Sequence, residues 1–320
     1  MGRVMHLHKF DVVLRDRNKA VKKQASPWKL GGLTKRQLMK RLYYEMDEDD
    51  VLTRAAALAY YFILALVPMI FFLMAILGLF ARSHDLQSGL LHYTSQIMPK
   101  DASRLVQSSL QEITYSSSAL KLALGLILAL WSGSGGISSI MDALNRCYEI
   151  KEFRPWWRRR LVSIVLTIAI SALIIVALVI VLYGGNIVDF IGLQVGLSTA
   201  AVMIWHLAQW PIVLLFVITS FALLYYWGPD AKQEWRWVTP GSLVGVVVWI
   251  GVSMLFRAYL HFFNTYNKTY GALGVVIVLL FWLYISGFAV LLGGEINSEI
   301  ENAAARLGHP EAKDAGEKAP

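Results

Sequence analysis

Long uncharged stretches dominate the pattern of hydrophobic and polar positions along the chain. A helix needs about 20 mostly apolar residues to cross the hydrocarbon core of a bilayer. Six stretches without Asp, Glu, Lys or Arg reach 20 residues or more: 55–81, 122–141, 161–188, 190–229, 237–256 and 269–294. Stretches of this length are typical of membrane-spanning helices rather than of helices in a soluble core.

The fourth stretch is 40 residues long, enough for one span or two. Its first part, Phe190 to Thr199, carries Gly, Gln, Ser and Thr, whereas Trp205 to Trp227 is strongly apolar. We expect an outer loop or a re-entrant piece followed by a single span. The pattern therefore predicts an all-α integral membrane protein with six transmembrane helices, near residues 55–80, 121–145, 160–183, 204–227, 237–259 and 271–295.

The distribution of charge predicts the orientation of these helices. Only 16% of the 320 residues are charged, and the net charge is +8. With six spans and an inner N-terminus, 24 of the 30 Lys and Arg residues lie on the inner side and four lie in the outer connections. Because Lys and Arg collect in cytoplasmic loops, we expect both termini in the cytoplasm and the protein in a bacterial inner (plasma) membrane.

The segments outside the spans are expected to be simple. Residues 1–50 are basic, and Thr34 to Met46 predicts an amphipathic helix with Leu38, Leu42 and Met46 on one face. We interpret this helix as an interfacial elbow against anionic headgroups rather than as a nucleic-acid site. The outer connection 82–118 predicts two short amphipathic helices, either a lid or a layer packed on the helix ends. Residues 301–320 are expected to form a disordered tail.

Motifs for common catalytic chemistry are absent from the sequence. The single cysteine, Cys147, excludes an internal disulfide and a Cys-rich zinc site. The chain has no HExxH, no Walker A motif and no metal-binding cluster of His and Asp. We therefore expect no metal, no cofactor, no enzymatic activity and no nucleic-acid partner.

Polar residues at membrane depth are the candidate functional positions, because such residues usually face the protein interior. In the second span, small or polar residues recur at spacings of three and four on one helix face: Ser132, Gly135, Ser139, Asp142 and Arg146, with Asn145 beside them. One interpretation is a helix-packing seam closed by an Asp142–Arg146 ion pair. The other is the wall of a polar pathway.

Charges and prolines in the other spans extend this set. Glu295, at the inner end of the sixth span, is expected to form an ion pair with Arg54 or Arg146, or else to bind a proton or substrate. Arg257 either extends its side chain to the interface or binds an anionic headgroup. Pro68 and Pro211 lie inside spans and are expected to kink them.

Three blocks of sequence resemble the YihY/BrkB family of bacterial inner-membrane proteins, to which the label ribonuclease BN is historically attached. They are residues 47–68 with Arg54 to Tyr61 as RAAALAYY, residues 142–160, and residues 270–295 ending in LLGGE. The family usually has LGAE where this chain has LGGE. The resemblance implies a six-span helical fold with both termini inside and a role in the cell envelope.

The leading hypothesis from the sequence is a transporter or lipid-handling permease with a lipid-like or anionic substrate. It rests on the polar face of the second span, the two prolines and Glu295. The alternative is a membrane scaffold that binds envelope proteins through residues 82–118. The sequence does not support a ribonuclease, because no motif predicts a catalytic cluster of carboxylates or histidines.

Overall fold

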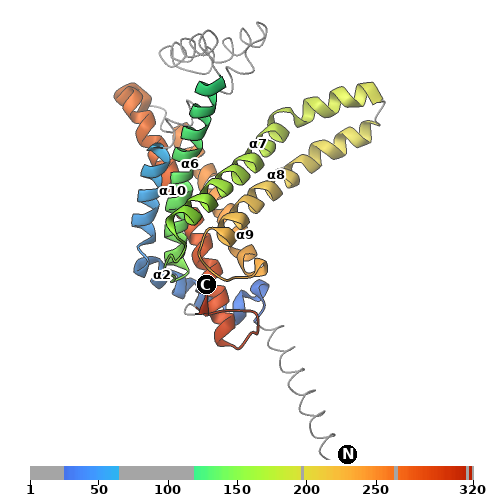
Figure 1. Ribbon diagram of the computed structural model, residues 1–320. Coiled ribbons are helices and arrows are strands. Elements are labelled where there is room, and N and C mark those ends of the chain that lie inside the picture. Colours follow the sequence, from blue (N-terminus) through green and yellow to red (C-terminus); the bar gives the residue numbers. More distant parts are fainter. Residues whose placement is uncertain (1–24, 65–118, 196–197, 263–265, 315–316, 319–320) are drawn as a thin grey trace, which may run out of the picture. The chain divides into compact units, whose positions relative to one another are not determined.

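The computed structural model describes residues 25–64, 119–195, 198–262, 266–314 and 317–318 (Figure 1). These residues form helices and turns and contain no strand, as expected for an all-α protein. The chain divides into two compact units, residues 60–137 and the remainder. Pro68 and the connection 82–118 lie outside the described residues.

Five long helices dominate the described chain (Figure 1): α6 (Ala119–Cys147), α7 (Trp156–Val195), α8 (Thr199–Trp227), α9 (Trp235–Phe262) and α10 (Tyr266–Arg306). Four of them contain segments long and apolar enough to cross a membrane: Trp156–Gly185, Ala200–Trp227, Trp235–Tyr259 and Val276–Arg306. Near the N-terminus lie the 3-10 helix η1 (Pro27–Gly32), α2 (Lys35–Glu48) and a further helix, Val51–Leu64.

The predicted amphipathic helix near the N-terminus is confirmed as α2. Its first turn is closed by a capping box, in which Thr34 and Gln37 each accept the other's backbone N–H. Leu38 and Leu42 are buried in a cluster with Ile300 of α10 and other apolar residues. The apolar face of α2 therefore packs on the C-terminal half of α10, whereas we had expected it to lie against headgroups.

Helices α7 and α8 form an antiparallel pair and lie side by side (Figure 1). The Trp205 indole N–H of α8 donates to the Gly184 carbonyl of α7 at 2.8 Å. We predicted an outer loop over residues 190–199, and these bounds are wrong. Helix α7 continues to Val195, and Ser198 caps the start of α8. Mutual packing lets both helices extend through weakly apolar sequence, since regular helix satisfies their backbone hydrogen bonds. α8 continues through Pro211 without a break.

The C-terminal region also differs from the expected disordered tail. Residues 301–306 belong to α10, and Gly308 ends the helix in the left-handed region, with φ of 81°. The following residues turn back onto α9 and α10. The ring of His309 lies 5.2 Å from that of Trp237, and Lys318 Nζ donates to the Asn302 side chain. Ser298, Glu301 and Asn302 are buried polar residues of α10, which the returning chain covers.

Candidate functional site

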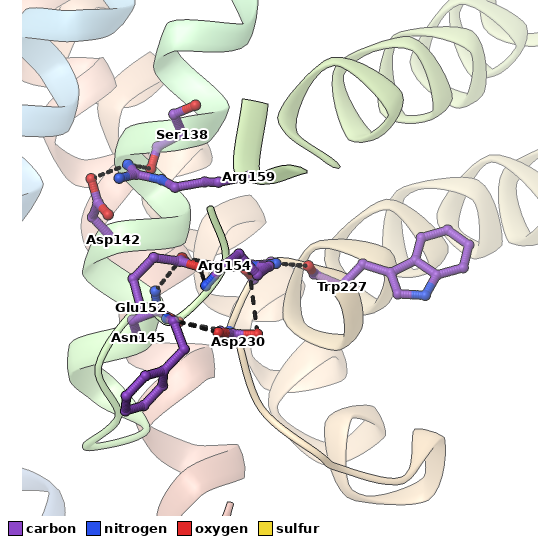
Figure 2. A network of polar contacts seen from close by, with 10 residues as sticks. Ser138, Asp142, Asn145, Glu152, Arg154, Arg159, Trp227 and Asp230 are labelled. Carbon is purple, nitrogen blue, oxygen red and sulfur yellow. Dashed lines mark hydrogen bonds and ion pairs between the residues drawn. The ribbon is translucent and has the colours of Figure 1, made fainter. Parts of the chain in front are cut away.

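Two connections between helices are joined by a network of polar contacts (Figure 2). Asn145, near the end of α6, donates to Glu152 at 2.9 Å and accepts the backbone N–H of Asp230 at 2.7 Å. Glu152 lies in the connection between α6 and α7, and Asp230 in the connection between α8 and α9. The Asn145 side chain thus fixes both connections to the end of α6.

Arg154 is the central cation of this network. Its guanidinium donates to Glu152 Oε1 at 2.6 Å and lies 3.6 Å from Asp230 Oδ1. It also donates to the carbonyls of Trp227 and Gly228, at 3.4 and 2.8 Å, where α8 ends (Figure 2). A cation is favoured there, because the C-terminal carbonyls of a helix carry partial negative charge. Burial alone would raise the pKa of Glu152, but hydrogen bonds from Arg154 and Asn145 lower it below its usual value.

A groove of about 490 Å³ opens beside this network, between the start of α7 and the α8–α9 connection. One wall is apolar and comes from α7. Leu161 and Val165 in that wall remain 54% and 48% exposed. The other side carries an aromatic edge and a polar end, and its residues are Tyr226, Trp227, Pro229, Asp230, Ala231 and Lys232, with Arg154 beside them. The groove is therefore amphiphilic along its length.

The structure corrects the ion pair expected between Asp142 and Arg146. Asp142 instead pairs with Arg159 of α7 at 2.5 Å, and Arg159 also donates to the Ser138 carbonyl (Figure 2). Arg146 pairs with Asp49 at 3.1 Å, at the end of α2. Spacing on a single helix had suggested a local pair, but oppositely charged side chains from other elements lie within reach of both residues.

Glu295 does not form the expected ion pair with Arg54 or Arg146. Glu295 is 1% exposed, and its carboxyl group lies close to the Asp49 carboxyl group and the Cys147 thiol. Arg54 donates to the backbone carbonyl of Asp49 at 2.8 Å. The structure therefore brings four residues together around Asp49, namely Arg54, Arg146, Cys147 and Glu295. The sequence did not single out Asp49.

The remaining candidates of the second span lie along α6, which confirms the helical spacing. Ser132, Gly135 and Ser139 are partly exposed, whereas Met141 and Leu144 on the opposite side are buried. A Cβ built at Gly136 would lie 3.1 Å from the Phe62 ring, whereas one built at Gly135 meets no described atom within 4 Å. Close packing in this part of α6 therefore occurs at Gly136. Arg257 is exposed on α9.

Sequence reasoning missed Asp49, Glu152, Arg154, Asp230 and Asn297. Four of them, all except Asn297, lie in the short connections between helices, where charged residues are common and carry no pattern. One signal was available, since Glu152 and Arg154 are opposite charges two residues apart between apolar stretches. Among the described residues, no group of three or more His, Cys, Asp or Glu side chains is arranged to hold a metal ion.

The long apolar helices, with charges confined to their ends and connections, define an all-helical membrane protein. The chain belongs to the family described as virulence factor BrkB, whose model matches residues 42–317. This result confirms the resemblance seen in the sequence. No solved structure matches the chain.

Several proteins are similar over most of the chain. One from Bacillus subtilis (strain 168), whose name is ribonuclease-like protein YfkH, is 35% identical over 81% of this chain and 94% of its own length. A UPF0761 membrane protein of Stenotrophomonas maltophilia (strain K279a) is 29% identical over 81% of this chain. One from Xanthomonas oryzae pv. oryzae (strain PXO99A) is 27% identical over 94% of this chain. The matches span 59% and 65% of these two longer proteins.

Proposed function

We propose that this chain is a permease of the bacterial inner membrane that handles phospholipids in the cell envelope, and that it is not an enzyme. The proposed topology has six spans with both termini in the cytoplasm. Four candidate spans, the apolar helix Val51–Leu64 and the length of α6 support that number. The excess of Lys and Arg in the inner connections supports the orientation.

The observation that carries the proposal is the amphiphilic groove beside Arg154. Its apolar wall belongs to the candidate span Trp156–Gly185, so in a membrane the exposed Leu161 and Val165 would face acyl chains. Its polar end holds Lys232, which is exposed, and lies where Trp227 ends its helix. Trp and Tyr prefer the headgroup level of the bilayer.

These features match the shape and chemistry of a phospholipid. The acyl chain would lie along Leu161, Val162 and Val165, and the phosphate beside the Lys232 ammonium group. Arg154 would hold the polar end of the groove in shape rather than bind the phosphate, because its guanidinium already contacts Glu152 and Asp230. An exposed apolar wall on a candidate span would contact the acyl chains of the bilayer, so the groove favours a lipid substrate over a soluble one.

The test uses the full chain reconstituted in phosphatidylcholine vesicles that contain a fluorescent phosphatidylglycerol. Chemical quenching from outside measures how fast the labelled lipid crosses the bilayer. Val165→Trp fills the groove and is expected to slow this movement strongly, as is Lys232→Glu. Ile175→Trp is the matched control, because Ile175 is exposed on the same helix but does not line the groove.

Two outcomes would contradict the proposal. If lipid crosses the bilayer no faster in vesicles with the wild-type chain than in empty vesicles, the proposed lipid-handling function is wrong. If Val165→Trp and Ile175→Trp slow lipid movement equally, the groove is not the site of that movement. Retained envelope function without lipid movement, abolished by deleting residues 82–118, would instead favour the scaffold alternative.

The topology is tested by labelling single cysteines with a membrane-impermeant maleimide in intact cells. Cys147 is the only cysteine and is replaced by Ala to give the background. Ser88→Cys is expected to react from outside, and Lys151→Cys only after the membrane is opened. Reaction of Lys151→Cys in intact cells would overturn the proposed orientation.

A further inference from the structure

Asp49 and Glu295 form a pair of buried carboxyl groups at the junction of three helices. Asp49 follows α2 and is 4% exposed, and Glu295 lies on α10 and is 1% exposed. The two carboxyl groups lie close enough to interact electrostatically. Among the described residues, neither Asp49 Oδ2 nor Glu295 Oε1 has a hydrogen-bond donor.

Burial of two neighbouring carboxyl groups favours a proton between them, because two ionised carboxylates have only acceptor oxygens. Without a proton, each of the two buried oxygens would lack a donor, and the negative charges of the neighbouring carboxylates would repel. One proton held between them removes both penalties. The pair would then carry a single negative charge, which the ion pair between Arg146 and Asp49 Oδ1 balances at 3.1 Å.

Charged groups of both signs surround the pair, and burial is the main effect that favours a bound proton. The cations are Arg146 of α6 and Arg54 of the helix Val51–Leu64, whose guanidinium donates to the Asp49 backbone carbonyl. Further acidic residues face the pair from α2 and from the α6–α7 connection, namely Glu45 and Glu149. Glu299, one turn beyond Glu295, is paired with Arg41 at 3.3 Å.

The neighbouring thiol is consistent with this arrangement. Burial raises the pKa of the Cys147 thiol well above its usual value, so Cys147 keeps its proton and donates to Glu295. Burial also raises the pKa of Asp49, against the opposing effect of Arg146.

We propose that Asp49 and Glu295 form a proton-binding site that couples proton movement to the action of this protein. The coupling part rests on the proposed lipid-handling function, whereas the binding of the proton does not. Deprotonation would place a second charge in the buried pair and separate α10 from the end of α2. That displacement links the protonation state to the helix arrangement.

The proton itself is tested by infrared difference spectroscopy on the full chain in phosphatidylcholine vesicles, titrated from neutral to alkaline pH. The wild type is expected to lose a carbonyl band of a protonated carboxylic acid. Glu295→Gln and Asp49→Asn, which keep the shape and remove the titrating group, are each expected to lack that band. The matched control is Glu299→Gln, because Glu299 lies on the same helix and pairs with Arg41; it is expected to retain the band.

Absence of the band from the wild type, or its survival in both variants, would overturn the proton-binding site. Coupling is measured separately by imposing a pH gradient on vesicles that contain fluorescent phosphatidylglycerol. The gradient is expected to change lipid movement by the wild type and not by Glu295→Gln. If the carboxylic-acid band is present but the pH gradient does not change lipid movement, only the coupling is overturned. No lipid movement, with the band present, would overturn the proposed function and the coupling but leave the proton site in place.

Discussion

The side-chain oxygen of Asn297 on α10 accepts the backbone N–H of Gly241 on α9 at 2.7 Å. The amide nitrogen of Asn297 donates to the Val238 carbonyl at 3.1 Å. Pro240 lies between these two positions and has no N–H to contribute to the α9 hydrogen bonds. One buried amide therefore bonds to α9 on both sides of its proline and joins it to α10.

Replacing Asn297 by Ala is expected to destabilise the protein by about 1–3 kcal/mol, because the Gly241 N–H would lose a buried partner. The Val238 carbonyl would keep the Ser242 hydroxyl as a donor. The measurement is thermal unfolding of the purified chain in detergent. Thr239→Ala, which removes a polar side chain on the exposed side of α9, is the control and should change the melting temperature little. A melting temperature of Asn297→Ala equal to that of the control would contradict the role given to this amide.

Replacing Gly241 by Ala is expected to force α9 and α10 apart. A Cβ at this position would lie 2.0 Å from the Gly293 carbonyl oxygen, which is backbone and cannot rotate away. Gly251→Ala on the same helix meets nothing within 4 Å and should be neutral or slightly stabilising, because Ala favours helix by about 1 kcal/mol over Gly. The melting temperatures of the two variants test this prediction. Equal values would contradict a close approach of α9 and α10 at Gly241.

The ion pair between Asp142 and Arg159 is expected to show a coupling energy of less than about 1 kcal/mol in a double-mutant cycle, since both side chains are partly exposed. The cycle between Asp142 and Arg146, the pair expected from helix spacing, should give a value near zero. Denaturant unfolding of Asp142→Ala, Arg159→Ala, Arg146→Ala and the double variants supplies these energies. A larger coupling for Asp142 with Arg146 would reverse the assignment.

Glu152 is expected to make stability depend on acidic pH. Its pKa is lowered in the folded state by hydrogen bonds from Arg154 and Asn145, despite burial, so the folded protein holds the ionised form more tightly than the unfolded chain does. The stabilisation is fully present above the unfolded pKa, about 4.3, and is lost as the pH falls through the lower folded value. Glu152→Gln should therefore lower the melting temperature at neutral pH, with a difference from wild type that shrinks on acidification. A difference that is constant with pH would contradict this assignment.

Several elements follow from local sequence alone. The capping box of α2 needs only Thr34 and Gln37, which are three residues apart, and its buried face follows from Leu38 and Leu42, which are one turn apart. The apolar stretches predicted most of α7 to α10, because a backbone in lipid must satisfy its hydrogen bonds within the helix. The helical face of Ser139, Asp142 and Arg146 was also predictable from spacing.

The partners of charged and polar residues did not follow from the sequence. Asp142 has Arg146 one turn away, yet its partner Arg159 comes from the next helix, because an ion pair forms with whichever charge packing brings near. The same holds for Glu295 with Asp49, which are far apart in the chain.

Composition, periodicity and short motifs were enough to identify the class of protein, the approximate helices and the family. Tertiary structure alone decided that α7 continues to Val195, that residues after Gly308 return to cover α10, and that Asp49 and Glu295 meet. The two kinds of interaction act over different distances along the sequence. Helix formation is governed by neighbours three and four residues apart, whereas buried polar groups obtain partners only when distant segments pack together.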